Sequence, residues 1–76
     1  MCGIAGYLNR NVGTAHIRQV IAWMNAAQRH RGPDDEGIYV HEDVGLGHRR
    51  LSVIDCSPAG HQPLANEDET LWLTFN

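Results

Sequence analysis

The sequence contains no lysine and only two cysteines among its 76 residues. Two cysteines are too few for a disulfide-stapled mini-protein, which usually has about four or more. No apolar run approaches the ~20 residues that a membrane-spanning helix requires, so no membrane association is expected. No basic leader segment follows Met1, so we expect a cytoplasmic protein with Cys2 and Cys56 as free thiols.

A dominant charge of either sign is also missing. Six arginines and nine acidic residues give a formal net charge of −3. A net acidic chain with scattered arginines lacks the basic patch that nucleic acid requires, so no nucleic-acid partner is expected. Arginine in the absence of lysine favours fixed, bidentate contacts with carboxylates. The short length indicates one small domain or a piece of one, which excludes a multidomain enzyme for this chain.

Local patterns predict an α+β fold. A short apolar strand is expected over residues 2–8, and a helix over Ala15–Arg29 with Thr14 as its N-cap. The remaining predicted elements are strands over 37–41, 44–54 and 70–76, turns at 32–35 and 42–43, and a loop over 55–68. A strand, a helix and then antiparallel strands indicate a helix lying on one face of a sheet.

The expected helix carries an apolar stripe at helical spacing, formed by Ile17, Val20, Ile21, Met24 and Ala27. We expect this stripe and Trp23 to belong to the core. The polar positions Arg18, Gln19, Asn25 and Gln28 are expected to face away from it. On the strand over 44–54, alternation predicts one face formed by Val44, Leu46, His48 and Arg50, and it places Arg49 on the other.

The last segment, residues 70–76, is strongly β-prone and apolar, and it runs to Asn76 without a turn or a polar tail. A strand of this kind needs neighbours on both sides. We therefore expect the natural chain to continue beyond Asn76, so that the 76 residues are a fragment whose apolar faces are left open.

Cys2 is the best candidate for a catalytic residue. Removal of Met1 would leave a thiol of pKa ~8.5 and an amine of pKa ~8 on the same Cα. The amine can act as general base for the thiol, directly or through a water, so no histidine partner is needed. The following Gly3 would let a substrate approach the backbone closely.

Other candidate sites have weaker support. None of the five histidines lies four residues from another on the predicted helix with an acidic third ligand, and there is no CxxC motif, so no metal site is expected. The Glu67–Glu69 segment is expected to be a solvated turn. Arg29 and Arg31 are expected to pair with acidic residues of the following loop, namely Asp34, Asp35 or Glu36.

Four segments carry a resemblance to a known family: Met1–Gly6, Arg29–Asp34, Gly47–Ser52 and Ser57–Leu64. The chain resembles the N-terminal glutamine amidotransferase domain of the class II, N-terminal-nucleophile hydrolase type. The last three segments look most like those of glutamine-hydrolysing asparagine synthetases. The resemblance implies that residues 2–76 form the N-terminal part of such a domain, as an incomplete αββα sandwich.

The resemblance also implies roles for individual residues. Cys2 would be the nucleophile that attacks the side-chain amide of L-glutamine, and Arg50 would pair with the glutamine α-carboxylate. Asn76 would contribute its side chain to the oxyanion hole and so contact the substrate. Such a donor is typically worth roughly 10²–10³ in rate. The main chain of the segment after Arg50 would line the same pocket, through Leu51, Ser52, Val53 and Ile54.

The resemblance implies no cofactor for this domain. It implies a C-terminal synthetase domain that uses ATP and Mg²⁺ to convert aspartate to asparagine with the ammonia released, and a homodimer as a candidate assembly of the whole enzyme. The chain alone lacks later parts of the family's motif and is expected to be inactive. Two alternatives stay open: an amidotransferase with another acceptor, such as a sugar or a cell-envelope precursor, and a non-catalytic, truncated interaction module.

Overall fold

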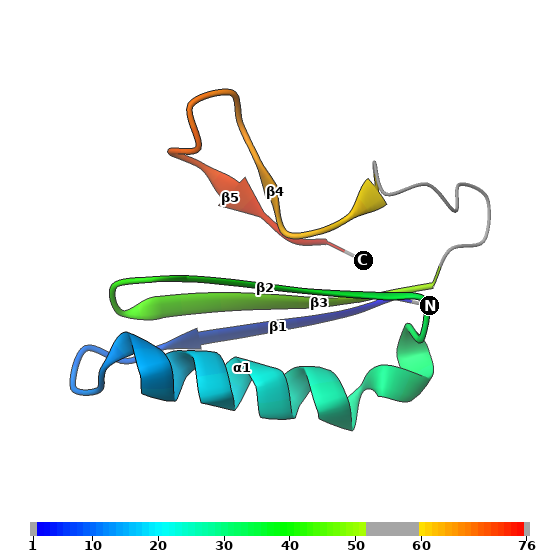
Figure 1. The fold of residues 1–76 in the computed structure, drawn as a ribbon, viewed down its shortest axis with the longest axis horizontal. Helices are drawn as coiled ribbons and strands as arrows, with labels where there is room; N and C mark the ends of the chain where they lie inside the picture. The colour runs from blue at the N-terminus through cyan, green and yellow to red at the C-terminus, as the bar shows by residue number, and fades with distance from the viewer. Residues whose placement is uncertain (1, 52–59, 76) are drawn as a thin grey trace.

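The computed structural model describes residues 2–51 and 60–75. Its elements in chain order are β1 (Gly3–Leu8), α1 (Thr14–Ala27), the 3-10 helix η1 (Arg29–Arg31), β2 (Asp35–His41), β3 (Val44–Arg50), β4 (Leu64–Ala65) and β5 (Trp72–Leu73). Helix α1 lies on one face of the larger sheet, and the β4–β5 hairpin lies on the opposite face (Figure 1). One helix on antiparallel sheets confirms the expected α+β class.

Strand β3 is the centre of the larger sheet, whose order is β1-β3-β2 with both pairings antiparallel. At the end of β3, His48 lies opposite Ile4 of β1 and Gly37 of β2. Because side chains alternate along a strand, successive residues of β3 face α1 and the hairpin in turn. A single strand therefore contributes side chains to both sides of the sheet.

Helix α1 approaches β3 closely because two positions of that strand have no side chain. A Cβ at Gly45 would lie 2.7 Å from Ile17 Cγ2, and one at Gly47 would lie 2.8 Å from Ile21 Cγ2. Ile17 and Ile21 are fully buried, and they are the only buried large apolar side chains of the described residues. The core is thus a narrow contact between one helix stripe and the backbone of the central strand.

Several expectations for the helix are wrong in detail. Gly13, not Thr14, is the N-cap, and its carbonyl accepts the first helical N–H groups. Trp23 is 63% exposed, because a position two residues after Ile21 lies about 200° around the helix. Asn25 is fully buried instead of facing away, since its Nδ2 donates a hydrogen bond of 3.1 Å to the carbonyl of Gly37.

The remainder of the stripe is only partly confirmed. Val20 is half-buried, whereas Met24 and Ala27 are exposed. Arg18 and Gln19 face solvent as expected, and Gln28 is half-buried above Gly3 of β1. In the part of the chain that the structure describes, no helix is long and apolar enough to cross a bilayer.

Strand boundaries also differ from those expected. β2 begins at Asp35, β3 ends at Arg50, and β4 lies within the predicted loop. The last strand is shorter than predicted, because the Asn66 side chain accepts from the N–H groups of Thr70 and Leu71 and holds them in a turn. Residues Glu67–Glu69 are exposed in this turn, as expected.

The hairpin packs on the sheet through an aromatic stack. The rings of Tyr39 in β2 and Trp72 in β5 lie 4.0 Å apart at an angle of 16°. Leu71 and Leu73, on either side of Trp72, are largely exposed, as are Ile4 and Leu8 of β1. The expected open apolar faces are therefore present on both the hairpin and the edge strand.

The glycine contact yields a test of the fold. Gly45→Ala would press a methyl group into Ile17 and Ile21, and overpacking of this kind costs about 1–3 kcal/mol. Gly6→Ala is the matched control, because the nearest atom to its Cβ would be 4.0 Å away. Urea unfolding should show the loss for Gly45→Ala alone. Equal stability of the two variants would show that α1 does not depend on this close approach.

Candidate functional site

Cys2 directly precedes β1, at the end of the sheet where β3 finishes. Cys2 is half-buried, and its thiol is not part of a disulfide. Gly3 lies opposite Arg49 and faces α1, so alternation directs Cys2 toward the hairpin side. The carbonyl of Cys2 accepts a hydrogen bond of 3.1 Å from Nε of Arg31, which ties the start of β1 to η1.

Arg50 is the last residue of β3 and lies at the same end of the sheet. Its backbone carbonyl accepts from the N–H of Asp34 at 3.0 Å, which fixes the strand end. Its guanidinium lies against Gly60, where a side chain would collide with it. Because Gly60 has no side chain, the guanidinium can lie against the segment that leads into the hairpin.

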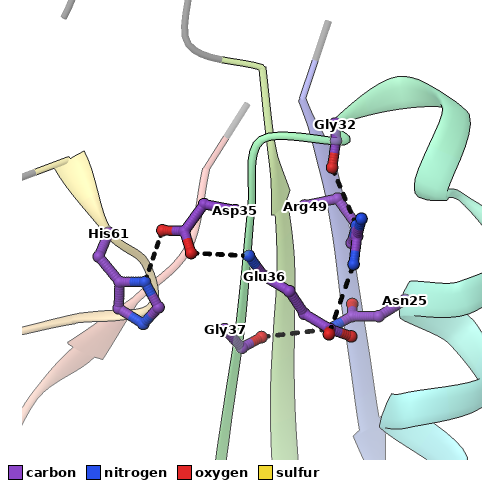
Figure 2. A network of polar contacts seen from close by, with 7 residues as sticks. All are labelled: Asn25, Gly32, Asp35, Glu36, Gly37, Arg49 and His61. Atoms are coloured by element: carbon purple, nitrogen blue, oxygen red, sulfur yellow. Dashed lines mark hydrogen bonds and ion pairs between the residues drawn. The ribbon is translucent and has the colours of Figure 1, made fainter. Parts of the chain in front are cut away.

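A hydrogen bond joins Asp35 and His61 beside Arg50. Nδ1 of His61 lies 2.6 Å from Oδ2 of Asp35, whose other oxygen accepts from the N–H of Glu36 (Figure 2). Burial raises the pKa of Asp35, but these hydrogen bonds and the charges of His61 and Arg50 outweigh it, so the pKa lies below its usual value. The carboxylate stays ionised and links β2 to the residue before Gln62.

Arg49 occupies the opposite face of β3, as alternation predicts. It is buried, and its Nε donates to the carbonyl of Gly32 at 2.9 Å while a terminal nitrogen lies 3.4 Å from Glu36 (Figure 2). Asp35 thus pairs with His61, and Glu36 pairs with Arg49. The expectation that these two acidic residues pair with Arg29 or Arg31 is wrong. Arg49 therefore stabilises the loop before β2 through its bond to Gly32. Of the two arginines at the end of β3, only Arg50 lies on the hairpin face.

The segment after β5 is held by two buried side chains. Oε1 of Gln62 accepts from the N–H of Phe75 at 2.9 Å, and Nε2 of His48 lies 3.1 Å from the carbonyl oxygen of Phe75. His48 is 1% exposed and Gln62 is 8% exposed. Both backbone groups of Phe75 are therefore paired at the end of the sheet that carries Cys2 and Arg50.

Burial and the contact with Phe75 determine the protonation state and the tautomer of His48. Burial lowers the pKa of His48 below its usual value, and the hydrogen bond to Phe75 only partly opposes this. The ring is then neutral near pH 7. Because a carbonyl oxygen can only accept, the single ring proton lies on Nε2.

The structure brings Cys2, Arg50 and Leu51 to one end of the sheet, where Leu51 is exposed just beyond β3. Ser52, Val53, Ile54 and Asn76 lie outside the described residues. Sequence reasoning missed the contributions of Gln62 and His61, which fall in the predicted loop and follow no periodic pattern. It did place His48 on the same strand face as Arg50, which was the one available signal for the contact with Phe75.

Comparison with known proteins places these residues in context. The model of the glutamine amidotransferase domain matches residues 1–76, the whole chain. The chain belongs to the glutamine amidotransferase domain family. Among curated proteins, it is 47% identical to asparagine synthetase [glutamine-hydrolyzing] 1 of Bacillus subtilis and 38% identical to asparagine synthetase B [glutamine-hydrolyzing] of Escherichia coli, in both cases over 100% of this chain.

A putative asparagine synthetase [glutamine-hydrolyzing] 2 of Methanocaldococcus jannaschii is 47% identical over 91% of the chain. This amidotransferase chain spans only 12% of the length of the Bacillus protein and 14% of the Escherichia and Methanocaldococcus proteins. The match therefore establishes the domain family, and the activity of the whole protein is a separate question.

The depressed pKa of His48 predicts how stability changes with pH. The unfolded chain has a histidine pKa of about 6.5 and binds more protons than the folded chain below that pH. Stability should therefore fall as the pH drops from about 6.5 through the lower pKa of folded His48. His48→Gln keeps an N–H donor but does not titrate, so its unfolding midpoint should fall less. Identical pH profiles for the two proteins would contradict the assignment.

Proposed function

We propose that this domain hydrolyses the side-chain amide of L-glutamine with Cys2 as the nucleophile. The observation that carries the proposal is that Cys2, which directly precedes β1, and Arg50, the last residue of the paired strand β3, lie at one end of the sheet in a chain of the glutamine amidotransferase domain family. With Met1 removed, the α-amine of Cys2 would accept the thiol proton. No other general base is then required.

The reaction proceeds in two balanced steps. The thiolate of Cys2 adds to the amide carbon of glutamine, and the C–N bond breaks as the departing nitrogen takes a proton and leaves as ammonia. Water then attacks the glutamyl thioester, which releases glutamate and restores the thiol. Each step passes through a tetrahedral oxyanion, so hydrogen-bond donors at that oxygen accelerate both.

The substrate contacts are part of the same proposal. Arg50 would bind the α-carboxylate of glutamine through its two-pronged guanidinium, and the main chain from Leu51 to Ile54 would line the pocket. Asn76 would donate to the oxyanion. The close approach of the Arg50 guanidinium to Gly60 shows that this segment leaves room for the guanidinium at the end of the sheet next to Cys2, which supports the proposal.

We further propose that the whole protein is a cytoplasmic glutamine-hydrolysing asparagine synthetase, as the names of its relatives suggest. Its synthetase domain would use ATP and Mg²⁺ to activate aspartate and would receive the ammonia. Residues 2–76 would begin a type 2 amidotransferase domain of the αββα type. The α1 layer, the larger sheet and the hairpin on its far face are consistent with the first three layers of that sandwich.

The test is Cys2→Ala in the full-length protein. Glutamine hydrolysis and glutamine-dependent asparagine formation should fall to background, because no thioester can form, while synthesis from added ammonia should persist. Both activities are measured in one coupled assay with glutamate and asparagine as products.

Cys56→Ser is the matched control, because Cys56 is the other cysteine of the sequence, and it should retain glutamine hydrolysis. Hydrolysis at the wild-type rate by Cys2→Ala would refute the proposal. Hydrolysis that depends on Cys2 but is accompanied by no asparagine formation from either nitrogen source would instead indicate an amidotransferase with a different acceptor.

A further inference from the structure

We propose that His48 and Gln62 are positioning residues for glutamine hydrolysis, because together they fix the Phe75 backbone that carries Asn76. The inference rests on the proposed function, in which Asn76 donates to the oxyanion. Neither side chain is assigned to contact the substrate. Their role is to set where the donor lies before the substrate arrives.

The two hydrogen bonds act on the two peptide units that flank the Cα of Phe75. Gln62 accepts from the N–H of Phe75, which belongs to the peptide unit before that Cα. His48 donates to the carbonyl oxygen of Phe75, which belongs to the peptide unit shared with Asn76. With both units held, rotation about both backbone bonds of Phe75 is restrained. The backbone of the residue that precedes Asn76 in sequence is thereby restrained.

Little else in the described structure holds this segment. β5 ends at Leu73, so Phe75 lies beyond the strand pairing, and its own side chain is 49% exposed. The hydroxyl of Thr74 makes only long contacts of 3.5 Å, with the carbonyl of Gly47 and with Oε1 of Gln62. The Phe75 backbone is therefore held mainly by His48 and Gln62.

The anchor points of these two side chains tie the donor to the rest of the site. His48 comes from β3, two residues before Arg50, and lies opposite Ile4, two residues after Cys2. Phe75 is thus held by a side chain of β3, which ends at Arg50 and pairs with β1, the strand that Cys2 directly precedes. Gln62 follows His61, whose pair with Asp35 anchors the same segment to β2. Alignment of an oxyanion donor contributes to rate only when its position is fixed in advance.

The experiment measures steady-state glutamine hydrolysis by the full-length protein. Gln62→Met removes the acceptor at similar length, and His48→Phe removes the donor while keeping a planar ring. Each should lower kcat by about 10- to 100-fold and leave the KM for glutamine within about twofold, because an oxyanion contact forms only in the transition state. His48→Gln retains an N–H donor and should recover most of the lost kcat.

The decisive comparison repeats these substitutions in an Asn76→Ala background. If they act through Asn76, Gln62→Met and His48→Phe should cause no further loss of kcat there. Losses that multiply with that of Asn76→Ala would overturn the inference, as would an increase in KM with unchanged kcat. If Asn76→Ala and Cys2→Ala themselves leave hydrolysis intact, the proposed function has failed first.

Gly45→Ala separates positioning from stability. Its added methyl group would meet Ile17 and Ile21 of α1, on the face of β3 opposite His48. The substitution should lower the unfolding midpoint and leave kcat unchanged. A loss of kcat in Gly45→Ala equal to that in Gln62→Met would show that the effect is general destabilisation, which would overturn the inference.

Discussion

The close contact between α1 and β3 is the constraint on which the other parts of the structure depend. Ile17 and Ile21 reach the sheet only because Gly45 and Gly47 leave the backbone of the central strand bare. With so few fully buried apolar side chains, this contact supplies most of the described core. It fixes β3 against the helix, and β1 and β2 take their register from β3.

A strand that is fixed on one face can hold polar groups in defined positions on its other face. His48 and Arg50 project from the hairpin face of β3, and the hydrogen bonds from the buried side chains of His48 and Gln62 to Phe75 connect this face to the segment after β5. Buried polar groups lower stability unless they are paired, so such contacts persist where their geometry is satisfied. One strand, β3, thus contributes to the apolar core on its α1 face and to the proposed catalytic site on its hairpin face.

Much of this arrangement could be predicted from sequence, where a repeating pattern exists. β1, α1 and the turn at Glu42–Asp43 follow from local periodicity, and alternation correctly separated Arg49 from Arg50. The buried Asn25 could not be predicted, because its partner is a carbonyl twelve residues away that only the packed fold brings near. Gln62 and His61 were missed for the same reason: their partners lie on β2 and beyond β5.

The most direct test of the account is a search for the covalent intermediate. The full-length protein is mixed with glutamine, quenched in acid within one turnover, digested and analysed by mass spectrometry. The account predicts a glutamyl thioester on a peptide that begins at Cys2 and lacks Met1, and none on Cys56. A glutamyl adduct on Cys56, or rapid glutamine hydrolysis with no adduct on Cys2, would contradict it.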